Sequence, residues 1–276
     1  MFFAKSKEKA LKMVWEVKKN DKKSYLIGTA HFFPHSFRNS ISRYINNSDI
    51  VLFEGPLDKD NMAKVIKAGY EKKNTRHLFD ELDSQTITNI TQALNPSCRG
   101  KNSFFIFNFD KLNKENPVYA MIEGMKPWLA FFTIWANFLQ RNGWKYSVDL
   151  EAYNIAVELG KNILSLETIE EQIKVLESLS HEKILDFLKR IGNWDAYAKE
   201  YVKCYLAGDL IKLKSNAIGF PSRHSSVIDR RDKILYERML AYLEKGDTVA
   251  FVGAPHIRGI SEMLRSEGYQ TRAEHS

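Results

Sequence analysis

The chain has 276 residues, of which 44% are hydrophobic and 27% are charged; this composition is typical of a folded globular protein and excludes a disordered or collagen-like chain. Its formal net charge is +7, but eight lysines against three acidic residues place a local charge of +5 within residues 1–23. The rest of the chain is nearly neutral. Because a nucleic-acid-binding face needs cationic residues spread along it, we expect no nucleic-acid partner.

The positions of the cysteines and the lengths of the apolar runs indicate the cellular compartment. Cys98 and Cys204 are far apart and form no Cys-x-x-Cys pattern, so neither a disulfide framework nor a thiolate metal site is predicted. The N-terminus lacks the apolar core of a signal peptide. The longest apolar run, residues 127–140, is shorter than the roughly 20 residues needed to cross a bilayer. We therefore expect a cytoplasmic protein without a transmembrane segment, organised as one domain over 1–276.

The N-terminal part is expected to form an arm and the first strands. Residues 1–13 read as a basic arm, either a solvated tail or a weak contact with an anionic membrane surface. The β-rich runs 14–17 and 25–29, separated by a polar turn, predict a hairpin. Residues 49–54 predict another strand, which ends in Glu54 before a Gly-Pro stop signal.

Helical patterns dominate the middle of the chain. They cover 59–72, 84–94, 126–141 and 149–159, with an irregular excursion at 95–117. A short apolar run at 162–167 again ends in a carboxylate, and a helical region follows over 169–213, with breaks near 178–181 and 192–193. The last elements are a helix at 226–244, a strand at 248–253, a helix from about 257 and a strand near 270.

This alternation predicts the fold class. Strands that alternate with helices imply crossover connections and a mostly parallel central sheet in an α/β architecture. The density of helix over about 59–244 predicts, in addition, a large helical insertion or cap over that sheet.

Four of the predicted strands lead into an ionisable residue: His31, Glu54, Glu167 and His256. In open α/β sheets the ligand crevice lies outside the carboxyl ends of the strands, so parallel strands would bring these residues to one edge. Two imidazoles with one or two carboxylates suit Mn, Fe, Co or Zn. The two histidines also share a Gly-x-x-His form, in which the glycine permits a tight exit from the strand.

Each of these residues also has a purely structural interpretation. A single histidine is more often a helix cap or a core residue than a ligand, and Glu54 could accept backbone donors at the sheet edge. Glu167 could belong to an ordinary helix start. His35 is a weaker candidate ligand, because Pro34 argues against a helix that would place it beside His31.

An arginine pair adds a candidate group for stabilising negative charge. Arg231 precedes the amphipathic helical pattern that leads to the 248–253 strand, and a buried arginine beside a metal could stabilise a developing oxyanion. The alternative is a solvated, charged helix start, which is the commoner role of an Asp-Arg-Arg-Asp run.

A series of short motifs spans nearly the whole chain in a specific order: Trp15-Glu-Val, Tyr25 to His31, Glu54, Lys126-Pro-Trp128, Val148-Asp149, Leu166-Glu-Thr168, Glu171-Gln172, Arg231-Asp232, Gly253 to His256, Gly259 and Glu267-Gly-Tyr269. In order and spacing the chain resembles the TraB/GumN (TraB/PrgY/GumN) family, which is related to the Tiki metalloproteases. More distantly it resembles erythromycin-esterase-like and haem-binding ChaN-like proteins, a kinship that supports the fold more than the chemistry. Two departures stand out: Asp232 occupies a position where the family usually has Asn, and the signal peptide of many bacterial members is missing.

The resemblance implies a metal-dependent hydrolase that cleaves peptide bonds, with Mn or Co as the favoured ion and Zn as an alternative. In that interpretation His31, Glu54 and His256 hold the metal or the attacking water. Glu167 acts as a further ligand or base, and Arg231 stabilises the oxyanion. Asp232 and His35 are additional candidates.

Two other functions stay open. The protein could sequester a peptide without cleaving it, as is thought of the pheromone-shutdown members of the family, or it could bind haem or another small ligand. Convergent ionisable residues favour the hydrolase, because a pure binding pocket is lined mainly with apolar groups. The expected partner is a peptide or protein substrate; the sequence predicts neither its identity nor the oligomeric state.

Overall fold

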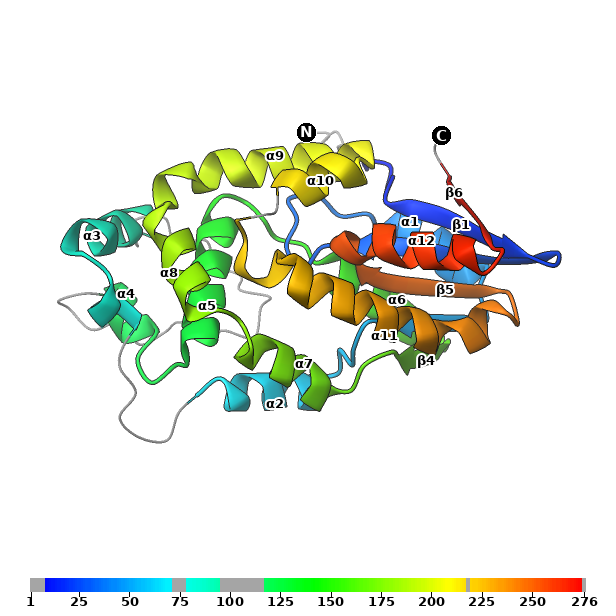
Figure 1. Ribbon diagram of the computed structural model, residues 1–276, viewed down its shortest axis with the longest axis horizontal. Helices are drawn as coiled ribbons and strands as arrows, with labels where there is room; N and C mark the ends of the chain where they lie inside the picture. Colours follow the sequence, from blue (N-terminus) through cyan, green and yellow to red (C-terminus); the bar gives the residue numbers. More distant parts are fainter. Residues whose placement is uncertain (1–7, 71–77, 95–116, 217–218, 275–276) are drawn as a thin grey trace, which may run out of the picture.

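The computed structural model describes residues 8–70, 78–94, 117–216 and 219–274. The molecule is elongated, with the strands gathered at one end and most of the helices at the other (Figure 1). The first seven residues of the predicted basic arm and residues 95–116 of the predicted excursion lie outside the described residues.

The sheet has six strands in the order β4-β3-β5-β2-β1-β6. Strands β4, β3, β5 and β2 are mutually parallel, whereas β1 runs antiparallel to both β2 and β6. This arrangement confirms the predicted α/β class with a mostly parallel sheet. The strands are β1 (Val14–Lys19), β2 (Lys22–Thr29), β3 (Ile50–Phe53), β4 (Asn162–Ser165), β5 (Thr248–Gly253) and β6 (Gln270–Ala273).

The first hairpin is tighter than its sequence predicts. Strands β1 and β2 pair as far as Lys19 with Lys22, so the turn consists of Asn20 and Asp21 alone. Both residues have positive φ angles, 49° and 60°, as a two-residue type I′ turn requires. Asn and Asp tolerate this left-handed conformation better than other side chains, which explains why the strands extend into the polar segment.

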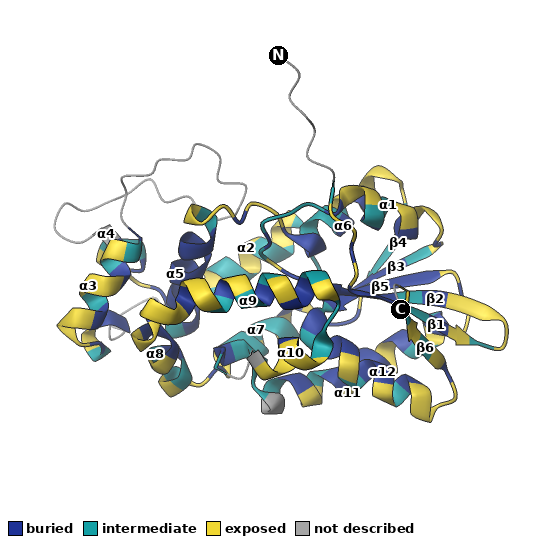
Figure 2. Ribbon diagram, turned by 90° about the horizontal axis from the view of Figure 1, so that it is seen from above, coloured by how far each residue is buried: buried dark blue, intermediate teal, exposed yellow. Residues whose placement is uncertain are grey.

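Helices cover both faces of the sheet (Figure 2). α1 (Arg38–Asn46) and α6 (Val148–Glu158) pack together, and α6 contacts β3, β4 and β5. On the opposite face α11 (Ser225–Leu243) and α12 (Ile257–Ser266) pack together and contact β2. Strand β5 lies in the centre with Val249 to Val252 fully buried, as expected of a parallel strand covered on both faces.

The remaining helices extend beyond the carboxyl ends of the parallel strands. They are α2 (Lys59–Ala68), α3 (Ser84–Ala93), α4 (Pro117–Met121), α5 (Pro127–Arg141), α7 (Ile169–Glu177), α8 (His181–Lys189), α9 (Trp194–Ala207) and α10 (Leu210–Asn216). The breaks between α7, α8 and α9 fall where the sequence predicts them. Trp135 of α5, Phe187 of α8 and Trp194 of α9 form an aromatic core with ring centroids 5.2–5.4 Å apart.

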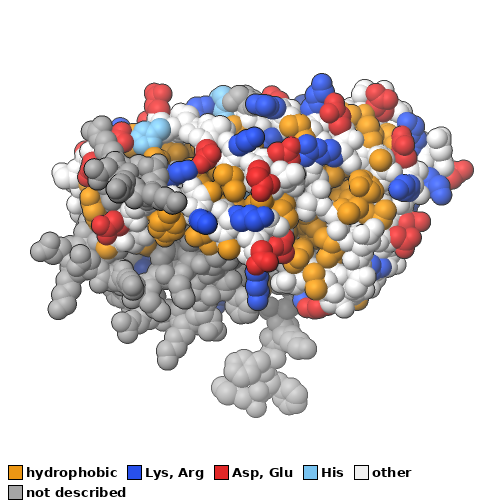
Figure 3. Space-filling model, turned by 90° about the horizontal axis from the view of Figure 1, so that it is seen from below, with side chains coloured by type: hydrophobic (Ala, Val, Ile, Leu, Met, Phe, Trp, Pro, Cys, Tyr) orange, Lys and Arg blue, Asp and Glu red, His pale blue; other side chains and the backbone are white. Residues whose placement is uncertain are grey.

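Helix α5 contains the long apolar run and is buried along most of its length, as predicted. Within the described ranges no helix has both the length and the apolar character needed to traverse a membrane. On the face of the molecule seen in Figure 3, cationic and acidic side chains are interspersed with apolar ones.

Candidate active site

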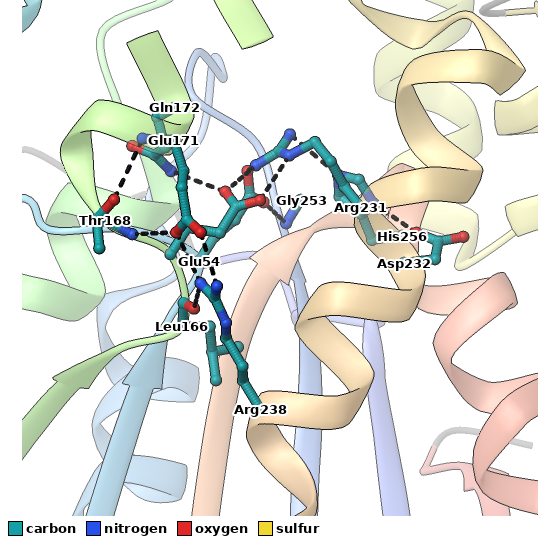
Figure 4. A network of polar contacts seen from close by, with 11 residues as sticks. Glu54, Leu166, Thr168, Glu171, Gln172, Arg231, Asp232, Arg238, Gly253 and His256 are labelled. Atoms are coloured by element: carbon teal, nitrogen blue, oxygen red, sulfur yellow. Dashed lines mark hydrogen bonds and ion pairs between the residues drawn. The ribbon is translucent and has the colours of Figure 1, made fainter. Parts of the chain in front are cut away.

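The carboxyl ends of four parallel strands carry the residues that the sequence singles out. Glu54 directly follows β3, and His256 lies in a short 3-10 turn directly after β5. Glu167 follows β4, and His31 follows β2, each with one residue in between. The backbone ties two of these ends together, since Glu167 N donates to Glu54 O at 2.8 Å. The structure thereby brings Glu54, Glu167 and His256 around the side chain of Arg231. Figure 4 shows Arg231 projecting from α11 towards Glu54, with His256 beside it.

Arg231 is the centre of this cluster. Its Nε donates to Glu167 Oε1 at 2.9 Å and its Nη2 to Glu167 Oε2 at 2.5 Å, a two-pronged pairing. Nη2 also donates to Glu54, and Nη1 lies 3.4 Å from His256 Nε2. The side chains of Arg231 and Glu167 are only 13% and 2% exposed. Arg231 is therefore not a solvated residue at a helix start, because its charge is held inside the protein between two glutamates.

Glu54 is fixed as an anion. Its second oxygen, Oε2, accepts a hydrogen bond from Gly253 N at 2.8 Å. Burial alone would raise the pKa of Glu54, but the positive charge of Arg231, followed by those of His256 and His31, outweighs it and holds the pKa well below the ordinary value. A side chain at Gly253 would crowd this contact, because its Cβ would lie 3.2 Å from Glu54 Oε2.

His256 is oriented by Asp232. Its Nδ1 donates to Asp232 Oδ1 at 2.5 Å, and the two side chains are 3% and 8% exposed. Burial raises the pKa of Asp232 against the opposing effect of His256. The bond leaves His256 Nε2 as the nitrogen that faces the cluster. Asp232 thus has a definite partner at the position where the family usually has Asn.

His31 forms a second pair of the same kind. Its Nδ1 donates to Asp149 Oδ2 at 2.9 Å, and the charge of the buried Asp149 raises the pKa of His31 to about 9. The His31 side chain is 74% exposed, so solvent reaches the ring. Asp149 lies in the first turn of α6, whose start is tied to the loop after β2 because Val148 N donates to Ala30 O at 3.0 Å.

Two contributors to the site receive no role from the sequence. Asp149 is 118 residues from His31, so the pair becomes visible only when the fold places α6 beside the end of β2. Gln172 Nε2 lies 3.5 Å from Glu167 Oε2, and its side chain fills the space that a Cβ at Gly55 would take, 2.2 Å away. Both belong to the short motifs of the family resemblance, and those motifs are the signal that marks them.

The remaining candidates lie at the margin of the cluster. His35 is half-buried, and its ring packs edge-on against Phe33 at 6.0 Å rather than among the residues around Arg231. Thr168 caps α7, with Glu171 completing a capping box. The helix-start interpretation therefore holds for Thr168, while the neighbouring Glu167 side chain turns to Arg231.

An open groove of ≈ 470 Å³ adjoins Glu167. It is lined by the backbone segment 165–170 together with Pro56, Asn61 and Arg238. Arg238 pairs with Glu171 through both terminal nitrogens and donates to Leu166 O at 2.7 Å. The hydrogen bond to Leu166 O fixes the backbone at the end of β4, next to Glu167.

The donor set suits a divalent metal in its chemistry. Histidines that ligate metals commonly donate their other ring nitrogen to a carboxylate, and His31 and His256 both do so here. With Glu54 they offer two imidazole nitrogens and a carboxylate oxygen, which suit Mn, Co or Zn. Among the described side chains, however, no group of three or more His, Cys, Asp or Glu is arranged to hold an ion. Arg231 supplies the positive charge between the carboxylates.

The fold and the site together define an α/β protein with paired histidine–carboxylate groups at the carboxyl edge of a mostly parallel sheet. The model of the TraB/PrgY/gumN family matches residues 13–273, and the chain belongs to this family. Neither the curated proteins nor the solved structures that were searched gave a match.

Proposed function

We propose that the protein is a metal-dependent hydrolase that cleaves peptides. The observation that carries this proposal is the pair of histidines, His31 and His256, each oriented by a buried carboxylate and each following one of two paired parallel strands, β2 and β5. Such pairs fix the ring orientation and leave Nε2 as the nitrogen that can face a metal; at His31, whose pKa is about 9, a metal would have to replace the Nε2 proton.

The side chains of the site have different roles in the proposed reaction. A bound divalent metal would polarise the scissile carbonyl and lower the pKa of a water molecule; His31, His256 and Glu54 are the residues that would hold it. Glu54 stays ionised at neutral pH because its pKa is low, which suits a permanent anionic ligand better than a general base. Arg231 keeps its charge at any physiological pH and can stabilise negative charge on the carbonyl oxygen.

Glu167 is a positioning residue in this proposal. Both of its oxygens accept from Arg231, so they are committed to holding the guanidinium. The groove beside Glu167 has the volume of a typical small-ligand site.

A second candidate is peptide binding without hydrolysis. The observation that favours it is the direct pairing of Arg231 with both glutamates, which offsets part of the negative charge that would otherwise attract a metal. The two candidates differ in whether metal is bound and whether a cleavage product appears.

Metal content separates them. The untagged full chain, incubated with Mn²⁺, Co²⁺ or Zn²⁺ and then desalted, should retain about one ion per chain by elemental analysis and should cleave members of a peptide library. His31→Ala/His256→Ala should lose both properties.

The matched control is His181→Ala, because His181 also pairs with a carboxylate, Glu81, at 2.9 Å but lies on α8 outside the cluster. This variant should behave as the wild type. Folded wild-type protein that retains none of the three ions would contradict the hydrolase proposal and favour peptide binding.

A further inference from the structure

Arg223 is a cation held among aromatic rings. It ends the short 3-10 turn Pro221–Arg223 that precedes α11. Its guanidinium carbon lies 4.4 Å from the centroid of the Tyr201 ring and 5.2 Å from that of Phe220. In the part of the chain that the structure describes, no carboxylate pairs with Arg223, whereas Arg231 and Arg238 each pair with glutamate.

Two phenol groups accompany this arginine. Nη1 of Arg223 donates to the Tyr197 hydroxyl at 3.4 Å, and the Tyr201 ring, with its own hydroxyl, lies directly beside the guanidinium. A phenol that accepts from arginine keeps its own O–H proton available for donation. The guanidinium and the two hydroxyls can all donate to an anion, and an arginine that is partly shielded from water favours a charged partner.

The group lies near the candidate active site. Tyr201 packs against Phe33, and its hydroxyl is within electrostatic range of both Arg223 and Asp149, the partner of His31. One turn further along α9, Tyr205 donates to Gly28 O at 2.6 Å. This part of α9 therefore lies over the end of β2, from which the chain continues to His31.

We propose that Arg223, with the hydroxyls of Tyr197 and Tyr201, binds a carboxylate of the peptide. The site then selects, for binding and for cleavage, peptides that carry a carboxylate at the C-terminus or on an acidic side chain. The cleavage part of this inference rests on the proposed hydrolase function, whereas the binding part does not.

Calorimetric titration of the full chain tests the binding part directly. The first probes are N-acetyl-tetraalanine as the free acid and as the C-terminal amide. The wild type should bind the acid about tenfold more tightly than the amide, the effect of one charge-assisted hydrogen-bonded contact. A third probe, the amide of N-acetyl-Ala-Ala-Glu-Ala, and its Gln counterpart show whether a side-chain carboxylate serves instead.

Variants test whether the preference for the free acid over the amide depends on Arg223. Arg223→Met keeps the apolar stem and should abolish the preference, whereas Arg223→Lys should keep part of it. Tyr197→Phe and Tyr201→Phe should each reduce it. The control is Arg43→Met, since Arg43 also lies over a tyrosine ring, that of Tyr44 at 4.7 Å, but on α1. Circular dichroism establishes that each variant is folded.

The result of this binding test is independent of whether the hydrolase proposal holds. An acid preference that depends on Arg223, in a protein that cleaves nothing with any metal, supports the carboxylate site while the hydrolase proposal fails. A wild type that binds none of the probes, binds acid and amide alike with no Glu-over-Gln preference, or keeps its preference in folded Arg223→Met overturns the inference.

Discussion

The carboxylate of Asp232 contacts two parts of the protein at once. Oδ1 accepts from His256, while Oδ2 lies so close to α12 that a Cβ at Gly259 would be 1.9 Å from it. The absence of a side chain at Gly259 therefore allows α11 and α12 to approach with a carboxylate between them. Because the atom that would clash belongs to a buried side chain, relief requires movement of the His256–Asp232 pair.

Gly259→Ala should consequently destabilise the protein and disturb His256. We expect the free energy of unfolding in urea to fall by about 1–3 kcal/mol, the usual effect of overpacking, and metal retention to fall with it. Gly192→Ala is the control, because a Cβ at Gly192 meets nothing within 4 Å. Equal stability of the two variants would show that the carboxylate can move at little cost.

At the level of elements, α7 and α11 are joined by the pair of Glu171 and Arg238, whose Oε1 and Nη2 lie 2.6 Å apart. The pair connects the capping box of α7 with the helix that carries Arg231, so it aligns two walls of the site. Hydrogen bonds from Arg238 and from the Thr168 backbone lower the pKa of Glu171 to about 2.

This lowered pKa gives a stability effect with a defined sign. The Glu171 carboxylate stabilises the fold above its unfolded-state pKa, near 4.5, and the contribution is lost as the pH falls from there towards 2. Glu171→Gln should therefore reduce the free energy of unfolding at pH 7 by no more than about 1 kcal/mol, since the pair is partly exposed.

The difference from the wild type should shrink as the pH is lowered from 4.5 to 2, measured by urea titration at each pH. Glu262→Gln is the control, because Glu262 forms an exposed pair with Arg258 within α12 and has no capping role. A difference for Glu171→Gln that stays constant with pH would contradict the assigned cause.

At the scale of the whole molecule, the sequence predicts the sheet better than it predicts the contacts within the site. Continuous apolar runs and stop signals locate β3 and β5 within a residue or two, and parallel order follows from their alternation with helices. The convergence of Glu54, Glu167 and His256 follows from that order as well. Asp149 and the charged environment of Glu54 do not, because they depend on how α6 and α11 dock, and side-chain contacts across more than a hundred residues leave no periodic pattern.

The sequence predicts one domain over residues 1–276, without indicating which contacts hold its two ends together. In the described residues one hydrophobic core joins the sheet to the helical end, with Phe251 and Trp194 as members from either side. Tyr205 provides a specific link, since its buried hydroxyl donates from α9 to Gly28 O in β2. A continuous core with a buried polar link should unfold cooperatively.

Tyr205→Phe tests whether the two ends form one unit. Loss of this buried hydrogen bond should lower the free energy of unfolding by about 1–3 kcal/mol, whereas Tyr146→Phe, at an exposed tyrosine, should change it by less than about 0.5 kcal/mol. Hydrogen exchange followed by mass spectrometry should show peptides from β5 and from α5 losing protection to the same extent in Tyr205→Phe, because both report the same global opening. If α5 became labile while β5 kept its protection, the helical end would be a separate cooperative unit that Tyr205 fastens to the sheet, and the residues of α9 over the end of β2 would then move relative to His31 and Asp149.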